Sequence, residues 1–321
     1  MKAIVINEFG GPNTLSFQEM TKPQPQAHQV LIQVQAAGVN YADVMQRAGQ
    51  YPFPIAFPAI VGQEVEGIVE AFGSEVSGWE VGQRVVAFTQ DNLGGYAEHA
   101  LANVADVFAL PTSLPQGHAT ALLVQGLTAQ KLLNHRPFAS VIITAAAGGV
   151  GSMATQIARI KGATTVVALV GSDEKQQKAE QNGATHAINY RHADWADQLT
   201  KVLPEGADLV LDSVGGETGT TLVGHTAMGS SYLSYGMASG QPASIASFQL
   251  ITRQIEARGV VLFYSTPDQR QAWFQELIQW VEAGKLTLDV QAYPLEDALQ
   301  AHQAIEARQT TGKMVLTTQH N

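Results

Sequence analysis

Cysteine is absent from this chain of 321 residues. Without thiolates the chain cannot build a cysteine zinc site, an iron–sulfur cluster or a disulfide scaffold, nor can it use a cysteine nucleophile. Basic residues are also few, with 18 Lys and Arg against 28 Asp and Glu and a net charge of −10. This balance argues against nucleic acid as a partner, since a nucleic-acid footprint needs clustered cations.

Long apolar runs are missing too. No stretch approaches the roughly 20 consecutive apolar residues that a membrane-spanning helix needs. The N-terminal apolar run from Ala3 to Ile6 is too short for the core of a secretory signal. We therefore expect a cytoplasmic protein that does not use a membrane. Because 45% of the residues are hydrophobic, the chain can bury a core, and its length suggests about two domains at ~150 residues each.

The first third has the pattern of a β-rich domain. Residues 30–36 alternate between apolar and polar side chains, and residues 60–72 are apolar and β-branched with breaks at Gly62 and Gly67. Glycine and proline recur every few residues up to residue 115. Short strands with frequent turn signals predict a barrel-like β domain over residues 1–120.

The pattern changes after residue 120. Short apolar runs now alternate with helix-like stretches, which predicts a parallel sheet with helices on both faces over residues 121–266. Residues 267–321 contain an amphipathic helix and then a strand, a helix and a strand, and we expect this segment to return to the first domain. The six expected strands lie at residues 141–145, 164–170, 187–190, 209–212, 232–235 and 259–265.

A glycine turn is the sharpest motif. The apolar run 141–145 leads into a turn with Gly148 and Gly151, and a helix is expected from Ser152 to Lys161. Ala146 takes the place of the first glycine of the G-x-G-x-x-G pattern. Small residues let the backbone approach a pyrophosphate, and the helix N-terminus presents free N–H groups to it. The turn predicts a dinucleotide site whose contacts are Ala147, Gly148, Gly149 and Val150.

The end of the next strand indicates which dinucleotide binds. NAD enzymes usually place an acidic residue there to hold the ribose hydroxyls, but here Val170 and Gly171 occupy the position. Ser172 and Lys175 follow, and a lysine can neutralise the 2′-phosphate of NADP(H). Asp173 is the counter-evidence, because a shifted turn would allow it to bind a ribose.

Several separated motifs together resemble the zinc-free quinone oxidoreductases, the ζ-crystallin-like branch of the medium-chain dehydrogenase/reductase superfamily. The resemblance implies a GroES-like β-barrel-type domain and a Rossmann domain with a doubly wound, six-stranded parallel sheet. Zinc-dependent relatives have a cysteine at the position of Asn40 and a histidine at the position of Gln63, so it implies no metal site of that type. The motifs lie at residues 36–43, 94–98, 125–128, 145–151, 183–190, 212–216 and 311–316.

The resemblance also implies contacts for NADPH. Lys175, Tyr190 and Arg308 match the residues that hold the 2′-phosphate in such reductases, and Gly171 and Ser172 lie beside them in sequence. Matches to the nicotinamide half of the site, and to the loop that lines the cofactor, are Asn40, Thr128, Tyr235, Gly236, Met237 and Phe263.

The implied reaction is hydride transfer from NADPH to a quinone or to the β-carbon of an enone. Negative charge then develops on an oxygen, and without zinc a hydrogen bond must stabilise that charge. We assign this catalytic role to Asn40 and Tyr51, the latter matching a tyrosine at the substrate mouth. Tyr41, a ribose hydroxyl and water are further candidate donors. No nucleophile–base arrangement is recognisable, and the sequence nominates no dedicated acid.

Two other functions stay open. An enoyl-thioester reductase needs cations for a carrier phosphate, and Arg47 is the one basic residue in segment 41–57. An NADPH-binding sensor or structural protein would keep the same cofactor motifs. For any of the three, the apolar run from Gly259 to Ser265 predicts a sheet-edge strand through which two copies form a homodimer.

Overall fold

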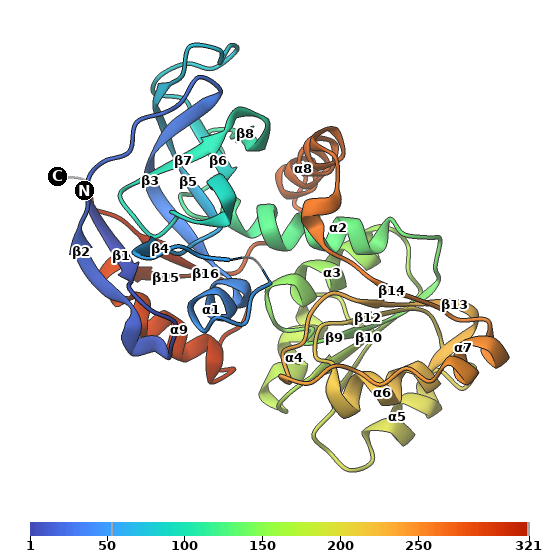
Figure 1. Cartoon of the computed structure of the whole chain (residues 1–321). Helices are drawn as coiled ribbons and strands as arrows, with labels where there is room; N and C mark the ends of the chain where they lie inside the picture. Colours follow the sequence, from blue (N-terminus) through green and yellow to red (C-terminus); the bar gives the residue numbers. More distant parts are fainter. Residues whose placement is uncertain (53, 320–321) are drawn as a thin grey trace. The chain divides into compact units, whose positions relative to one another are not determined.

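The structure, a computed structural model, describes residues 1–52 and 54–319. The chain divides into two compact units, drawn in the colours of the sequence in Figure 1. The first comprises Met1–Val124, Pro267–Glu282 and the described chain from Thr287 on, and the second comprises Gln125–Thr266 and Ala283–Leu286. The division falls inside the π-helical turn η4 (Ala121–Gly126).

The first unit is built mainly on antiparallel strands, and one pair is parallel, residues 290–294 with residues 313–317. A seven-stranded sheet has the order β15-β16-β3-β5-β6-β8 with β7 paired to β3, and a three-stranded sheet has the order β2-β1-β4. The central strand β3 pairs with β5, β7 and β16, so the C-terminal segment is part of this sheet. The strands are β1 (Lys2–Ile6), β2 (Ser16–Glu19), β3 (Gln29–Val39), β4 (Ala59–Ile60), β5 (Glu64–Phe72), β6 (Arg84–Phe88), β7 (His99–Asn103), β8 (Val107–Ala109), β15 (Val290–Pro294) and β16 (Lys313–Thr317).

The described part of the first unit contains three α-helices: α1 (Tyr41–Arg47), α8 (Pro267–Glu282) and α9 (Ala298–Glu306). Helix α8 is held at two points. The ring of Phe274 packs 4.8 Å from that of Phe108, and Arg270 forms an ion pair with Asp106 at 2.5 Å. Among the described helices of the chain, none is long and apolar enough to cross a membrane.

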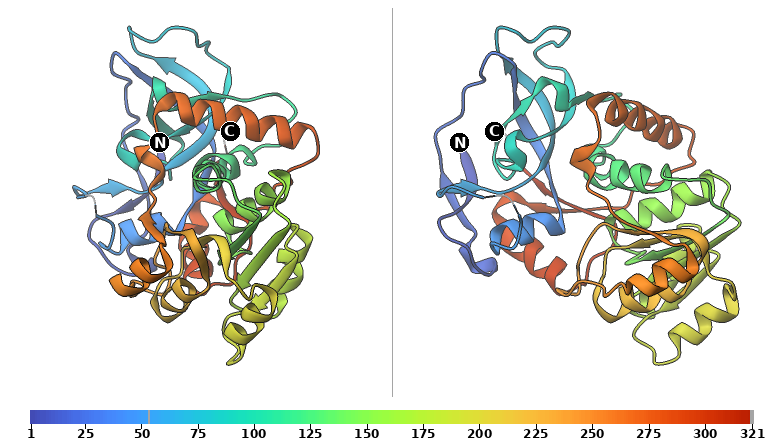
Figure 2. Two further views of the ribbon diagram at one scale, coloured as in Figure 1. Left: turned by 90° about the vertical axis from the view of Figure 1, so that its right-hand side faces the viewer. Right: turned by 45° about the vertical axis from the view of Figure 1, so that its right-hand side comes forward.

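The second unit is a doubly wound α/β fold. Its six parallel strands have the order β11-β10-β9-β12-β13-β14, which confirms the expected Rossmann sheet. Helices α2 and α3 cover one face of the sheet, and α5 and α6 cover the other (Figures 1 and 2). The elements are α2 (Leu127–Leu133), β9 (Ser140–Thr144), α3 (Gly149–Ile160), β10 (Thr165–Val170), α4 (Glu174–Gln181), β11 (His186–Asn189), α5 (Trp195–Val202), β12 (Ala207–Asp212), α6 (Gly216–Gly224), β13 (Thr226–Ser234), α7 (Ser247–Arg253) and β14 (Glu256–Gly259).

The expected edge strand from Gly259 to Ser265 is wrong. Strand β14 ends at Gly259, its four residues are exposed, and three of them are Glu256, Ala257 and Arg258 rather than large apolar residues. The apolar run after β14 forms a 3-10 turn, η5 (Leu262–Tyr264). Tertiary packing is the reason: the Leu262 side chain is 5% exposed, and Lys131 of α2 donates to the carbonyl of Val261 at 2.7 Å, which takes the backbone out of the sheet.

Candidate functional site

The glycine turn forms at the carboxyl end of β9. Ala145 takes the left-handed conformation with φ of 49°, and the Gly148 N–H donates to its carbonyl at 2.8 Å. A Cβ on Gly151 would lie 2.3 Å from that carbonyl oxygen, so only glycine fits there. Helix α3 begins at Gly149, not at Ser152 as expected, because the phosphate turn itself forms the first helical turn. Its first amides have no acceptor within the helix, as an anion site requires.

The strand order places this turn beside a crevice. Strands β10 and β11 lie to one side of β9, whereas β12, β13 and β14 lie to the other, so the winding reverses between β9 and β12. Ligands of doubly wound sheets bind at the carboxyl ends of the strands at such a point. The carboxyl ends of β9 and β12 are joined by hydrogen bonds. Thr144 Oγ1 donates to Asp212 Oδ1 at 3.1 Å and accepts from the Ser213 N–H at 2.8 Å.

The loop after β13 lies at the same edge. The Tyr235 N–H donates to the carbonyl of Asp212 at 2.9 Å, and the Ala238 N–H donates to the carbonyl of Ser213 at 2.8 Å. The predicted contacts Tyr235, Gly236 and Met237 are therefore brought to the crevice. Burial raises the pKa of the Tyr235 hydroxyl, which keeps it protonated and able to donate.

Helix α2 contributes on the other side of the turn. Gln125 lies just before α2, and its side chain packs against Gly149. A Cβ on Gly149 would lie 2.1 Å from Gln125 Nε2. Thr128 is 8% exposed in the first turn of α2. Phe263 is not at a strand end as expected but in the turn η5, where it is partly buried.

A group of polar side chains surrounds Gly171 at the end of β10. A Cβ on Gly171 would lie 3.0 Å from the Tyr190 hydroxyl and 3.9 Å from Arg191 Nε. Ser172 follows Gly171, and Lys175 stands in the first turn of α4. These donors suit a 2′-phosphate. Arg191 was missed by the sequence analysis; a cation directly after the matched Tyr190 was the available signal.

Asp173 was the sequence evidence in favour of NAD, but its carboxylate has partners within the protein. Its Oδ1 accepts a hydrogen bond from Asn189 Nδ2 at 2.8 Å and lies 3.1 Å from His192 Nε2. The carboxylate thus bridges the end of β11. Arg308, the third member of the expected phosphate trio, belongs to the first unit, where it is exposed just after α9 with φ of 57°.

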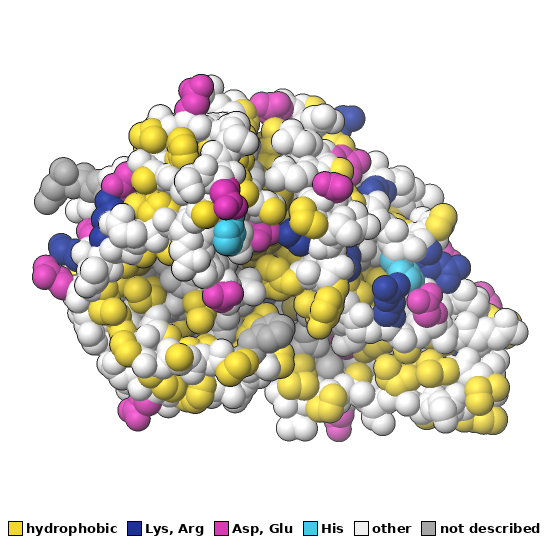
Figure 3. All heavy atoms as spheres, turned by 45° about the horizontal axis from the view of Figure 1, so that its top comes forward, with side chains coloured by type: hydrophobic (Ala, Val, Ile, Leu, Met, Phe, Trp, Pro, Cys, Tyr) yellow, Lys and Arg dark blue, Asp and Glu magenta, His cyan; other side chains and the backbone are white. Residues whose placement is uncertain are grey.

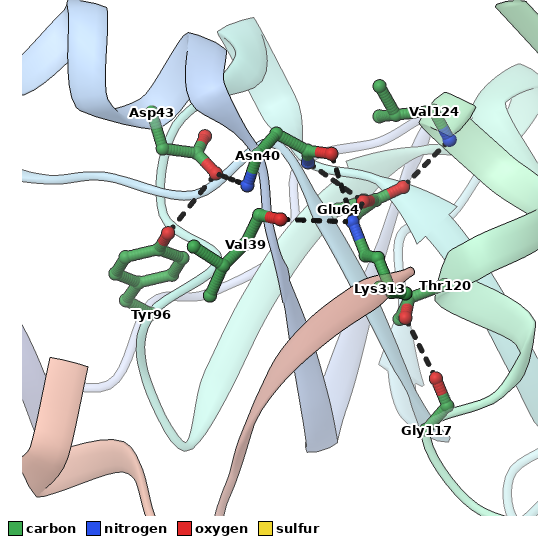
Figure 4. A network of polar contacts seen from close by, with 9 residues as sticks. All are labelled: Val39, Asn40, Asp43, Glu64, Tyr96, Gly117, Thr120, Val124 and Lys313. Carbon is green, nitrogen blue, oxygen red and sulfur yellow. Dashed lines mark hydrogen bonds and ion pairs between the residues drawn. The ribbon is translucent and has the colours of Figure 1, made fainter. Parts of the chain in front are cut away.

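A buried polar cluster lies in the first unit (Figure 4). Glu64 at the start of β5 and Lys313 at the start of β16 form an ion pair, and both side chains are 0% exposed. Asn40 bridges the pair: its Nδ2 donates to Glu64 Oε1 at 2.8 Å, and its Oδ1 accepts from Lys313 Nζ at 2.9 Å. The orientation of this predicted catalytic amide is therefore determined by its two charged neighbours.

The sequence around the cluster makes room for it. A Cβ on Gly38 would lie 2.3 Å from Glu64 Oε1, so glycine is required there. The second carboxylate oxygen of Glu64 accepts from the Val124 N–H at 2.8 Å. The sequence analysis missed Glu64 and Lys313; isolated charges at the starts of apolar strands were the signal, since buried charges need partners.

Tyr51, the other predicted catalytic residue, lies near this cluster. It is partly buried and hydrogen-bonds the Gln63 side chain, and burial raises the pKa of its hydroxyl. The phenol is thus a proton-bearing donor at neutral pH. Within residues 1–52 and 54–319, no group of three or more His, Asp or Glu side chains is placed to hold a metal ion.

The chain resembles known proteins along nearly its whole length. Residues 26–112 match the family model of the alcohol dehydrogenase GroES-like domain, and residues 149–283 match that of the zinc-binding dehydrogenases. The quinone oxidoreductase of Pseudomonas aeruginosa is 34% identical over 98% of this chain and 99% of its own length. The chain belongs to the quinone oxidoreductase family.

Solved structures of this family agree over the full length. The Escherichia coli quinone oxidoreductase, complexed with NADPH, has a TM-score of 0.93 at 30% identity and covers 99% of this chain and 100% of its own. The quinone oxidoreductase of Pseudomonas syringae pv. tomato has a TM-score of 0.92 at 33% identity and covers 98% of this chain and 99% of its own. The expected family and the GroES-like and Rossmann folds are confirmed.

Proposed function

We propose that this protein transfers a hydride from NADPH to a quinone or an α,β-unsaturated carbonyl compound, without zinc. The observation that carries the proposal is the glycine turn at the switch point of the sheet, in a chain that matches quinone oxidoreductases along its whole length. The hydroxyl of Tyr190 and the guanidinium of Arg191 beside Gly171 support NADPH over NADH.

The residues fit this cofactor group by group. The amides of Gly149 and Val150, with Ala147 and Gly148 before them, suit the pyrophosphate. For the 2′-phosphate we propose Gly171, Ser172, Lys175, Tyr190 and Arg308, with Arg191 added. For the nicotinamide half we propose Asn40, Thr128, Tyr235, Gly236, Met237 and Phe263.

The cofactor supplies the hydride, and the chain supplies position and electrostatics. Asn40 Nδ2 keeps one hydrogen beyond the one that it donates to Glu64. Tyr51 presents a hydroxyl that is protonated at neutral pH. Both groups are therefore donors for the acceptor oxygen on which negative charge develops, and their orientation before the reaction lowers its barrier.

Turnover tests this function. We expect the ultraviolet absorbance of NADPH to fall with 9,10-phenanthrenequinone, 1,4-benzoquinone and a simple enone, and at least about tenfold more slowly with NADH, since hydrogen bonds to a charged group contribute about 1.5–3 kcal/mol. A preference for NADH would contradict the phosphate assignment. Tight NADPH binding without turnover would support the sensor alternative instead.

An enoyl thioester belongs in the same assay as the competing substrate. Figure 3 shows basic side chains interspersed with acidic and apolar ones on the face drawn, which does not single out a surface for a carrier phosphate. We expect the quinones to react with the higher kcat/KM. A higher kcat/KM for the thioester would replace the proposed substrate class.

We further propose that the protein is a cytoplasmic homodimer. Strand β14 is an outer strand of the six-stranded sheet, and exposed apolar side chains follow it, with Val261 45% and Tyr264 83% exposed. Light scattering should give about twice the chain mass of 34.2 kDa. Tyr264→Asp should shift the mass toward the monomer, whereas Val81→Asp, at an equally apolar exposed site (66%) of the first unit, should not. A monomeric wild-type protein would contradict the proposal.

A further inference from the structure

Phe9 is a half-exposed aromatic residue that contacts the chain on both sides of Tyr51. A Cβ on Gly49 would lie 2.8 Å from Phe9 Cγ, so the ring packs directly on the Gly49 backbone. The ring of Phe57 lies 4.8 Å from that of Phe9, edge to face with 73° between the planes, a geometry that aromatic pairs prefer. Since Gly49 precedes Tyr51 and Phe57 follows it, one ring touches both ends of the segment that carries the proposed donor.

Helix α1 leads into this segment through a defined helix end. The Gly49 N–H donates to the carbonyl of Gln46 at 3.1 Å, and the Gln50 N–H donates to that of Met45 at 2.8 Å. With Gly49 at a φ of 71°, these two bonds form a Schellman motif, in which a left-handed glycine ends the helix. The absent side chain of Gly49 also leaves room for the Phe9 ring. The backbone is therefore fixed as far as Gln50.

Beyond the helix end the backbone depends on side-chain contacts. The described residues between α1 and β4, 48–52 and 54–58, form no helix or strand. Ile55 packs against the apolar core of the first unit, and the side chain of Gln63 hydrogen-bonds that of Tyr51. These contacts keep the segment attached to the unit, whereas its two ends are held by the aromatic ring described above.

Phe9 is in turn fixed to α1. The N–H of the next residue, Gly10, donates to the carbonyl of Arg47 at 3.0 Å, and the carbonyl of Gly10 accepts from Arg47 Nε at 3.1 Å. The Arg47 side chain is 1% exposed, and its Nη2 donates to Glu306 of α9 at 2.6 Å. Its Nη1 lies 3.4 Å from His302 Nδ1, which accepts because arginine only donates. These contacts fix the backbone beside Phe9 and hence the place of its ring.

The same helix is fixed at its other end, where Asn40 is the N-cap. Asp43 Oδ2 accepts from the Asn40 N–H at 2.7 Å and from the Tyr96 hydroxyl at 3.1 Å. The Tyr96 hydroxyl also lies 3.1 Å from His302 Nε2. Because the other ring nitrogen of His302 faces Arg47, one histidine connects the two ends of α1. The helix is thus a rigid reference for the residues around it.

Both proposed donors are placed with reference to this helix, since Asn40 precedes α1 and Tyr51 follows it. A donor stabilises developing charge when it lies about 2.7–3.1 Å from the oxygen. A misplacement of about 1 Å can lower the rate about 10²-fold. Because Phe9 is fixed to α1 and holds the segment around Tyr51, its ring determines how the two donors lie relative to each other.

We propose that Phe9 is a positioning residue, whose ring, by holding Gly49 and Phe57, places the Tyr51 hydroxyl at the acceptor oxygen. This inference rests on the proposed function. Phe9 acts through the segment and is assigned no contact with substrate or cofactor. Its side chain is 46% exposed, so it buries less apolar area than a core phenylalanine and contributes less to stability. Its role can therefore be tested in a folded protein.

Phe9→Ala is the first test. The kcat with a simple enone should fall about tenfold or more, because the donor is no longer held in place. The KM for the enone should change little, since the hydroxyl acts on charge that develops in the transition state. The Kd for NADPH should stay unchanged. Phe9→Tyr keeps the ring and both contacts, and it should retain most of the wild-type kcat.

Tyr51→Phe separates positioning from a general loosening of the protein. This variant keeps the ring of Tyr51 and removes the hydroxyl, and its kcat should fall by a similar factor. In the Tyr51→Phe background, Phe9→Ala should have almost no further effect, because residues that act as a unit are not additive. Losses that multiply would show that Phe9 affects kcat by another route and would overturn the inference.

Phe72→Ala is the matched control. Phe72 ends β5 in the same unit and is 38% exposed, so its truncation removes a comparable apolar area. The urea midpoints of Phe72→Ala and Phe9→Ala should fall by similar amounts, but kcat should fall in Phe9→Ala only. If Phe9→Ala does not fold, Phe57→Leu removes the edge-to-face contact instead. It should lower kcat in the same way, and an unchanged kcat would overturn the inference.

The remaining outcomes distinguish this inference from the proposed function. A wild-type protein that reduces neither quinone nor enone overturns the proposed function itself. An active wild type whose Phe9→Ala variant keeps its kcat overturns only the role of Phe9. If Tyr51→Phe keeps the wild-type kcat, the hydroxyl is not the donor, and the inference fails while hydride transfer stands.

Discussion

Lys313→Met is expected to lower the free energy of unfolding by about 3–5 kcal/mol, because it leaves the Glu64 carboxylate buried without its cation. Both charged side chains are 0% exposed, so water cannot replace the lost partner. Asn40 Oδ1 also loses its donor, and kcat should fall because the amide is no longer held in one orientation. Urea unfolding followed by circular dichroism measures the loss of stability as a lower midpoint.

Two further variants test the reason for this loss. Adding Glu64→Gln to Lys313→Met removes the uncompensated charge, and the double variant should be more stable than Lys313→Met alone by about 1 kcal/mol or more. Lys22→Met breaks the exposed pair with Glu70, whose side chains are about one-third accessible, and should cost less than about 1 kcal/mol. Equal losses for Lys313→Met and Lys22→Met would contradict the role of burial.

Lys175→Glu is expected to weaken NADPH binding about 100-fold while changing NADH binding little. The substitution removes a cation from the first turn of α4 and places a negative charge where the 2′-phosphate is proposed to bind. A lost charge-assisted hydrogen bond contributes about 1.5–3 kcal/mol, and repulsion adds to it. Fluorescence titration with each cofactor measures the two dissociation constants.

Lys178→Glu is the matched control, since it makes the same charge change one turn later on α4. It should alter the dissociation constant for NADPH by less than about threefold, because the charge stands farther from the proposed phosphate and salt screens it more. Arg191→Ala should weaken NADPH in the same selective way as Lys175→Glu, through the guanidinium beside Gly171. Equal weakening of NADH and NADPH by Lys175→Glu would contradict the phosphate assignment and indicate a damaged fold.

Much of this molecule follows from short-range rules. The glycine turn and the alternation of strands and helices depend on residues close together in sequence. Gly151 shows why, because the turn that needs it is closed by Ala145, only a few residues earlier. The sequence motifs likewise predicted the family and the two folds that the comparisons confirm.

Contacts between distant segments decided the rest. The run after Gly259 looked like a strand, but its place beside α2 made it a turn, with Lys131 bonded to Val261. Asp173 looked free to hold a ribose, yet Asn189 and His192 engage it.

The glycine turn could be predicted from the sequence by itself, and the sequence also supplies the residues on which the proposed preference for a 2′-phosphate rests. The buried polar groups could not: Asp43, Glu64, Tyr96, His302 and Lys313 are polar residues far apart in the chain, and polarity by itself predicts exposure. Only the tertiary structure removes them from water and pairs them. Burial and partners determine the charge and orientation of such groups, and these depend on the whole fold rather than on local sequence.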